Sequence, residues 1–200
     1  MKTIKILSVD FDYFMDTDLD TRNDLFPNGF DEMPLEELNK KWNDAYVRYP
    51  QLKDIGLTSD YDQIKDILSR VKGDFFVSPT HKDIKQLLDH IPLDVQIEIV
   101  NVDFHHDMYC YYSKDTNYNC STWLRRLIEE RPYTRAFWCR REDSDTRVLW
   151  GEVEIPHTIG LDVIKYDTFD MCFICESPEW SLPHLHSKYE ELIEVLRNKG

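Results

Sequence analysis

The sequence predicts a single α/β domain, a three-layer sandwich built on a mainly parallel sheet. Short β-branched and apolar runs alternate with amphipathic helical segments, an order that produces parallel strands covered by helices. A length of 200 residues and a hydrophobic content of 42% suit one continuous globular core. No linker, low-complexity tract or internal repeat divides the chain, so we expect one domain over residues 1–200.

The first half of the chain repeats a strand followed by helices. The predicted elements are a strand at 3–9, a loop at 21–34, helices at 34–49 and 59–73, and a strand, turn and helix over 74–92. Pro34 suits the first turn of its helix, and Ser59 or Asp60 caps the next one. Gly73 and Pro92 end their helices, because neither residue continues one.

The second half repeats the same alternation. The predicted elements are a strand at 95–107, a helix at 117–132 capped near Ser121 or Thr122, strands at 135–141, 147–154, 158–164 and 170–176, a turn at 141–145, a loop at 177–187 and a helix at 188–199. The strands are rich in β-branched and aromatic residues, and the last helix is amphipathic. In open parallel sheets, binding sites form at the carboxyl ends of the strands.

The charge of the chain excludes several classes of partner. The 24 Lys and Arg residues against 38 Asp and Glu residues give a formal charge of −14, which disfavours nucleic acid and anionic membranes. A cation or metal ion suits this charge, although most of the acids solvate the surface. We see no export signal and no membrane span. Five irregularly spaced cysteines indicate a reducing cytoplasm. The oligomeric state stays open.

The motif DFHHD ends the predicted strand at 95–107. Side chains two residues apart on a strand share a face, so Asp103, His105 and Asp107 converge if the chain stays extended. His106 then points to the other side.

A second acidic group, Asp10 and Asp12, ends the first predicted strand. Both strand ends open on one edge if the strands are parallel neighbours in one sheet, and the two groups then face each other. Asp16 and Asp20 are read as ordinary surface acids.

Four carboxylates and an imidazole in one place repel one another unless a cation lies between them. Carboxylate and imidazole ligands suit Mn, Zn, Fe or Mg, and the number of acids favours two ions. Paired ions about 3.5–4 Å apart share a water and present hydroxide to a carbon or phosphorus centre. These observations predict a metal-dependent hydrolase.

The two motifs resemble those of the arginase and agmatinase superfamily of binuclear manganese ureohydrolases. DFHHD has the D-x-H-x-D form of that family, and SVDFDYF is similar to its D-x-D motif. His81, about one strand and one helix before DFHHD, fits a further ligand histidine. The D-x-D motif comes first here, so the arrangement looks circularly permuted. This order, the small size, NCSTWL and SPEW resemble a branch that includes the peptide arginases.

The resemblance implies an arginase/deacetylase-like fold, two Mn²⁺ ions and a division of ligands. One ion would be held by His81, Asp103, Asp107 and Asp10. The other would be held by His105, Asp103, Asp10 and Asp12, with Asp103 and Asp10 bridging. The reaction would convert arginine, within a peptide by this resemblance, into ornithine and urea. Asp107 or Asp12 would accept a hydrogen bond from the attacking hydroxide. Free arginine and agmatine remain open as substrates.

An arginase-like site also needs an acid that binds the guanidinium, which pairs with carboxylates through two hydrogen bonds. Glu179 within SPEW is the preferred residue, followed by Glu176.

The region that holds a proton-shuttling histidine in arginases contains Asn119 and Cys120 here. Asn119 is therefore a candidate for substrate binding. His106, His184 or His186 are the candidates for the shuttle. Cys120 and two tryptophans, Trp123 and Trp180, are assigned to the core or to the wall of the site.

Three other functions remain open. A deacetylase-like amide hydrolase would use the same fold and a similar metal site. A haloacid-dehalogenase-type phosphatase is similar only in the D-x-D motif, and Tyr13 and Phe14 do not fit its continuation. An inactive module that binds a cationic peptide would keep the pocket without turnover. Cys172 and Cys175 point to opposite faces of their strand, so we assign them to the core.

Overall fold

The computed structural model describes residues 2–109, 118–146 and 155–198 and shows an α/β fold around one parallel sheet. The six strands of the described chain lie in the order β2-β6-β1-β3-β4-β5, and every neighbouring pair is parallel. Their bounds are β1 Thr3–Asp10, β2 Phe75–Ser78, β3 Gln96–Val102, β4 Thr134–Arg140, β5 His157–Ile159 and β6 Met171–Cys175. The predicted α/β class and the parallel sheet are therefore confirmed.

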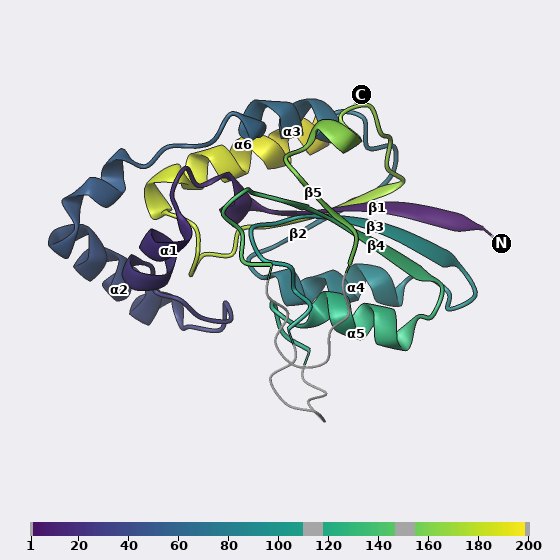
Figure 1. Ribbon diagram of the computed structural model, residues 1–200, viewed down its shortest axis with the longest axis horizontal. Helices are drawn as coiled ribbons and strands as arrows, with labels where there is room; N and C mark the ends of the chain where they lie inside the picture. The colour runs from purple at the N-terminus through teal and green to yellow at the C-terminus, as the bar shows by residue number, and fades with distance from the viewer. Residues whose placement is uncertain (1, 110–117, 147–154, 199–200) are drawn as a thin grey trace.

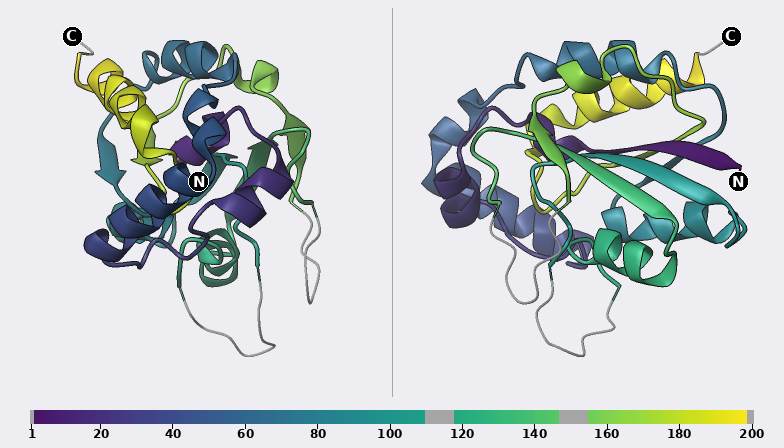
Figure 2. Two further views of the ribbon diagram at one scale, coloured as in Figure 1. Left: turned by 90° about the vertical axis from the view of Figure 1, so that its left-hand side faces the viewer. Right: turned by 45° about the vertical axis from the view of Figure 1, so that its right-hand side comes forward.

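Helices cover both faces of this sheet (Figure 1). Their bounds are α1 Leu19–Leu25, α2 Leu35–Arg48, α3 Asp60–Leu68, α4 Ile84–Asp89, α5 Trp123–Glu130 and α6 His186–Arg197. Helices α3 and α6 lie on one face, and α4 and α5 lie on the other. Figure 2 shows α1 and α2 beyond the carboxyl ends of the strands. None of the helices in the described ranges is long and apolar enough to cross a bilayer.

The strands bury both faces, as parallel sheets do. In β1, Leu7 and Val9 join the core beneath α3 and α6, whereas Ile6 joins the core beneath α4 and α5. The same alternation separates Cys172 from Cys175, which confirms the prediction that they point to opposite faces. Ser8 and Asp10 follow Ile6 on the α4 and α5 side and are buried polar residues of this strand.

Several boundaries differ from the prediction. Helix α1 occupies part of the predicted loop at 21–34, and Asp18 caps it by accepting a hydrogen bond from the Thr21 N–H at 2.7 Å. The predicted strand at 158–164 ends at Ile159, because Gly160 has a φ of 73° and a 3-10 turn follows. The predicted strand at 147–154 lies outside the described residues.

Candidate metal centre

The acidic ends of β1 and β3 lie side by side because the two strands are paired in parallel. Ser8 pairs with Asn101 and Val9 with Val102, so Asp10 and Asp103 follow on adjacent strands at the same edge. On the other side of β1, Asp10 pairs with Cys175 of β6. The expectation that the two acidic motifs share one rim therefore agrees with the geometry.

The first group of potential ligands centres on His81, which begins the turn before α4. Its Nδ1 lies 3.3 Å from Asp10 Oδ2, 3.2 Å from Asp103 Oδ2 and 3.2 Å from Asp107 Oδ2. All four residues are buried. One imidazole nitrogen thus faces three carboxylates, one from the end of β1 and two from the segment after β3.

The second group centres on His105. Its Nδ1 lies 3.2 Å from Asp12 Oδ2 and 3.9 Å from Asp103 Oδ1. Asp103 therefore turns one oxygen toward each histidine, which is the arrangement of a carboxylate shared by two ions. Asp10 belongs only to the first group here, because its Oδ1 accepts the Asp12 N–H at 3.1 Å. The bridging role expected for Asp10 is not seen.

These side chains do not converge through an extended strand. Strand β3 ends at Val102, and Asp107 adopts a left-handed φ of 52°. The Trp123 indole N–H donates a hydrogen bond to Asp107 Oδ2. Asp12 lies in the 3-10 turn Phe11–Phe14, beyond the end of β1. The extended conformation on which the predicted convergence depended is therefore not found. Tight turns and local hydrogen bonds place the side chains instead.

Three polar residues contact the ligand side chains and orient them. Ser8 Oγ lies 2.6 Å from His81 Nε2, so a proton on Nε2 leaves the Nδ1 lone pair facing the carboxylates. Asn101 Nδ2 donates to Asp103 Oδ2 at 3.3 Å, and Ser177 Oγ donates to Asp10 Oδ2 at 2.6 Å. The prediction missed them. A signal existed in S-V-D and N-V-D, where a polar residue interrupts an apolar strand two positions before each aspartate.

Burial and mutual repulsion raise the pKa of two carboxyl groups, to about 6 for Asp10 and to about 7 for Asp103. Burial alone would lower the pKa of His105, but the Asp12 carboxylate, 3.2 Å from its Nδ1, raises it to about 9. The close contact with His105 and its charge outweigh burial at Asp12 and lower the pKa of that carboxyl. The pKa of His81 is also raised, against the effect of burial, by its acidic neighbours. Without a metal ion, this cluster retains protons.

Several ligand atoms are buried without a hydrogen-bond partner among the described residues. They include both carboxylate oxygens of Asp12 and the Nδ1 of His81. Buried polar atoms are nearly always paired, and unpaired charges are costly to bury. Divalent cations bound by carboxylate and imidazole would satisfy these atoms, so the residues fit the two expected ions.

Arg22 supplies a buried positive charge beside the centre. Its Nη2 donates to the backbone oxygens of Asp12 at 2.8 Å and Met15 at 3.1 Å, and its Nη1 lies 3.7 Å from Asp12 Oδ2. Burial lowers the pKa of Arg22 to about 10, which leaves it charged at neutral pH. Sequence reasoning gave no sign of it, because residue 22 was assigned to a loop.

Cys175 was also missed as a potential ligand. It forms a third group with Asp10 and His81 whose ligand atoms lie within 4.8 Å of one another. Burial, with Asp10 nearby, raises the pKa of its thiol well above the usual value.

A cavity of about 220 Å³ adjoins the centre. Its wall contains Asp10, His105 and Asp107 from the two ligand groups, and Ser177 beside them. The rest of the wall is formed by Leu19, Asn23, Gly29, Phe30, Asp31, Tyr109, Cys120, Ser121, Asp145 and Trp180. Cys120 and Trp180 therefore line the site, as expected.

The two glutamates predicted to bind substrate do not line this cavity. Glu179 is 2% exposed, and its Oε1 accepts the Met33 N–H at 2.8 Å. A Cβ built on Gly29 would lie 1.6 Å from Glu179 Oε2, so this carboxylate packs directly against the backbone of residue 29. Glu176 lies 2.6 Å from His186 Nδ1. Both carboxylates have partners within the protein.

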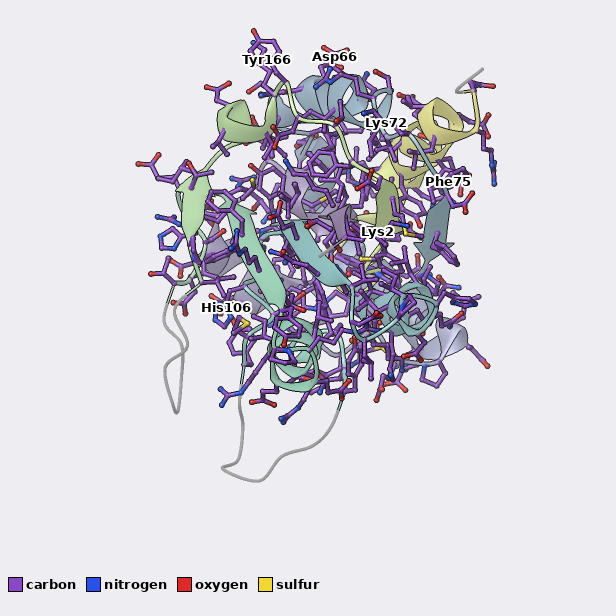
Figure 3. The ribbon with its side chains drawn as sticks, turned by 90° about the vertical axis from the view of Figure 1, so that its right-hand side faces the viewer. Lys2, Asp66, Lys72, Phe75, His106 and Tyr166 are labelled. Atoms are coloured by element: carbon purple, nitrogen blue, oxygen red, sulfur yellow. The ribbon has the colours of Figure 1, made fainter. Side chains whose placement is uncertain are left out.

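The remaining predicted residues are not part of the cavity wall, and their side chains have partners within the protein. His106, labelled in Figure 3, accepts the Met108 N–H at 2.9 Å and stacks on Tyr109. Asn119 Oδ1 accepts hydrogen bonds from Ser121 at the start of α5. His184 contacts Tyr46 and the Ile55 carbonyl. The structure thus offers no support for His106, His184 or His186 as a proton shuttle, or for Asn119 as a substrate ligand.

Comparisons with known proteins add nothing to this geometry: no family model matches the chain, and no curated protein or solved structure matches it either.

Proposed function

We propose that the chain is a binuclear-metal hydrolase that acts on the guanidinium of arginine, free or within a peptide, and gives ornithine and urea. The observation that carries the proposal is Asp103, whose two oxygens face His81 on one side and His105 on the other. A carboxylate shared in this way is what a pair of divalent ions requires. The order of the motifs supports a permuted relative of the arginases.

The ligands of the two proposed ions follow from the two groups. His81, Asp10, Asp103 and Asp107 would hold one ion, and His105, Asp12 and Asp103 the other. When bound, such a pair activates a water for attack on a carbon centre. Ser8, Asn101 and Ser177 keep the ligands in place, and Asp107 borders the cavity, where it can accept a proton.

The cavity suits a small cationic group. Its volume of about 220 Å³ is below the ~300–1,000 Å³ typical of sites for drug-sized ligands. An arginine side chain fits such a space. The acids in the wall favour a positive charge, and the buried centre strengthens that attraction because the local dielectric is low.

The test combines metal analysis with a urea assay. Protein stripped with a chelator is reloaded with Mn²⁺, Zn²⁺ or Mg²⁺ and incubated with arginine, agmatine and a short arginine-containing peptide. We expect two ions per chain and release of urea that depends on the metal. Asp103→Asn serves as the inactive control. Two bound ions without urea from any guanidino compound would contradict the proposal.

One observation favours an amide hydrolase as the second candidate. Tyr109 lines the cavity, and a hydroxyl donor beside a metal centre suits the transition state of amide cleavage. Acetyl-lysine peptides, assayed for acetate under the same conditions, separate the two reactions. Release of phosphate from a generic ester would instead support the phosphatase. A phosphatase of that type gives His81 and His105 no role. Metal uptake without turnover of any substrate would indicate a binding module.

A further inference from the structure

The cavity wall includes Asp31, a half-buried carboxylate that the ligand groups do not use. Asp31 belongs to none of the groups in the described chain that could hold an ion, yet it lines the cavity together with Asp10, His105 and Asp107. Its Oδ1 accepts the Glu179 N–H at 3.4 Å. Its Oδ2 is inaccessible to solvent and has no hydrogen-bond partner among the described residues.

The loop that carries Asp31 is fixed in place by the segment after β6. The Gly29 carbonyl accepts the Trp180 indole N–H at 3.0 Å, and the Met33 N–H donates to Glu179 at 2.8 Å. These contacts hold the chain on both sides of Asp31. A carboxylate in a fixed position is suited to binding a ligand in one orientation.

A cationic donor suits the unpaired Oδ2 of Asp31, because the nearby carboxyl groups of Asp10 and Glu179 add negative charge. A metal ion needs several ligand atoms, and no other ligand group gathers around Asp31 in the described residues. An organic cation with N–H donors meets the requirement. Phe30, Tyr109 and Trp180 in the same wall offer aromatic surfaces, on which a planar guanidinium packs well.

We propose that Asp31, rather than Glu179 or Glu176, is the carboxylate that binds the guanidinium of the substrate. The inference rests on the proposed function, since it assigns the cation-binding residue of the same site. Glu179 is a positioning residue, because it accepts the Met33 N–H and so holds the loop that carries Asp31.

The test compares Asp31→Asn with Glu32→Gln. The first change keeps the shape and the oxygen that accepts the Glu179 N–H, and the second removes an exposed charge from the next residue. The probes are N-acetyl-arginine methylamide and its citrulline counterpart, which is neutral and nearly the same shape. Urea release gives kcat/KM, calorimetric titration gives affinity, and metal content and thermal unfolding show whether the variants remain intact.

We expect Asp31→Asn to keep both ions and to lose at least about 30-fold in kcat/KM for the arginine compound. Its preference for arginine over citrulline in binding should disappear, while Glu32→Gln keeps that preference. If Asp31→Asn retains the preference of the wild type, the inference is overturned even if urea is formed.

The two proposals fail in different ways. A wild type that binds the arginine compound through Asp31 but releases no urea supports the cation site and contradicts the hydrolase. A wild type without any preference for arginine over citrulline overturns the role of Asp31.

Discussion

The candidate site joins two regions of different origin, the metal rim at the ends of β1 and β3 and the outer wall made by residues 28–33 and 176–181. The rim follows directly from strand pairing, which places Asp10 and Asp103 on adjacent strands. The wall depends on loops that adopt unusual backbone conformations, with positive φ at Asn28, Asp31 and Ser177. Such conformations are uncommon outside glycine and often accompany functional sites.

The two regions therefore differ in how firmly the fold holds their side chains. Paired strands fix Asp10 and Asp103 of the rim within the core, and the tight turns that follow the strands place Asp12 and Asp107. The wall is held by a few hydrogen bonds between two loops, notably those of Glu179 and Trp180. Changes in the rim should therefore affect metal binding, and changes in the wall should affect substrate binding while the metal stays.

The largest effect is expected from Asp103→Asn, which alters the carboxylate shared by both groups. Urea formation should fall about 1,000-fold or more, since both ions lose a ligand. Metal-free Asp103→Asn should nevertheless be at least as stable at pH 8 as the metal-free wild type, because it removes a buried acid held close to others. Activity assays and thermal unfolding with and without Mn²⁺ check both results. A variant that keeps two ions and full activity would show that Asp103 is not shared.

The second prediction concerns the stability of the metal-free protein against pH. The folded-state pKa values of Asp10 and Asp103, about 6 and 7, exceed the ordinary value of 3.8, and that of His105, about 9, exceeds 6.5. Each group stabilises the fold when protonated, and that contribution disappears as pH rises through the raised value. The free energy of unfolding should fall by on the order of a few kcal/mol between about pH 4 and 9.

The pKa of Asp12 is lowered in the folded protein, so its contribution to stability has the opposite sign. The ionised carboxylate stabilises the fold, and this contribution is lost only as pH falls below about 4. Mn²⁺ binds the deprotonated ligands, so the loaded protein should gain stability over the range in which the metal-free form loses it. Urea denaturation at several pH values with and without Mn²⁺ measures both curves. Parallel curves would mean that these groups do not bind the ion.

The sequence predicted the rim well and the wall poorly, for physical reasons. Asp10, Asp12 and the DFHHD motif follow strong apolar runs, and parallel strands bring such ends to one edge. Arg22 reaches the site from the short helix α1, and Asp31 reaches it from the loop that follows. Both residues fell in the predicted loop at 21–34, where no periodic pattern indicates the position of a side chain. Glu179 was chosen for its charge and its position within SPEW after the last strand, whereas burial against Gly29 decides what its carboxylate contacts.

A third and smaller effect should follow from the residues behind the ligands. Ser8→Ala removes the hydroxyl 2.6 Å from His81, and such changes typically lower metal affinity about 10- to 100-fold. Asn101→Ala should have a weaker effect, because its contact with Asp103 is longer, at 3.3 Å. Metal titrations measure both, with Ser69→Ala on the exposed end of α3 as the control. Equal affinities for Ser8→Ala and Ser69→Ala would show that Ser8 does not orient His81.

The smallest effect tests the wall by itself. Gly29→Ala places a methyl group where Glu179 Oε2 now lies, so that carboxylate has to move and its hydrogen bond to Met33 weakens. Overpacking of this kind costs about 1–3 kcal/mol of stability. Gly56→Ala is the matched control, since nothing lies within 4 Å of its added Cβ. That change should be neutral or stabilising by up to about 1 kcal/mol, because alanine restricts the unfolded chain.

Gly29→Ala should leave the content of bound Mn²⁺ unchanged, because no ligand lies on the loop of residues 28–33. It should raise KM for arginine by displacing Asp31 in the cavity. The two readouts together separate the wall from the rim: lost metal would show that the loop supports the ligands, and an unchanged KM would show that the position of Asp31 does not depend on Glu179. If loops alone fix the wall, Gly29→Ala should show a raised KM for arginine and an unchanged content of bound Mn²⁺.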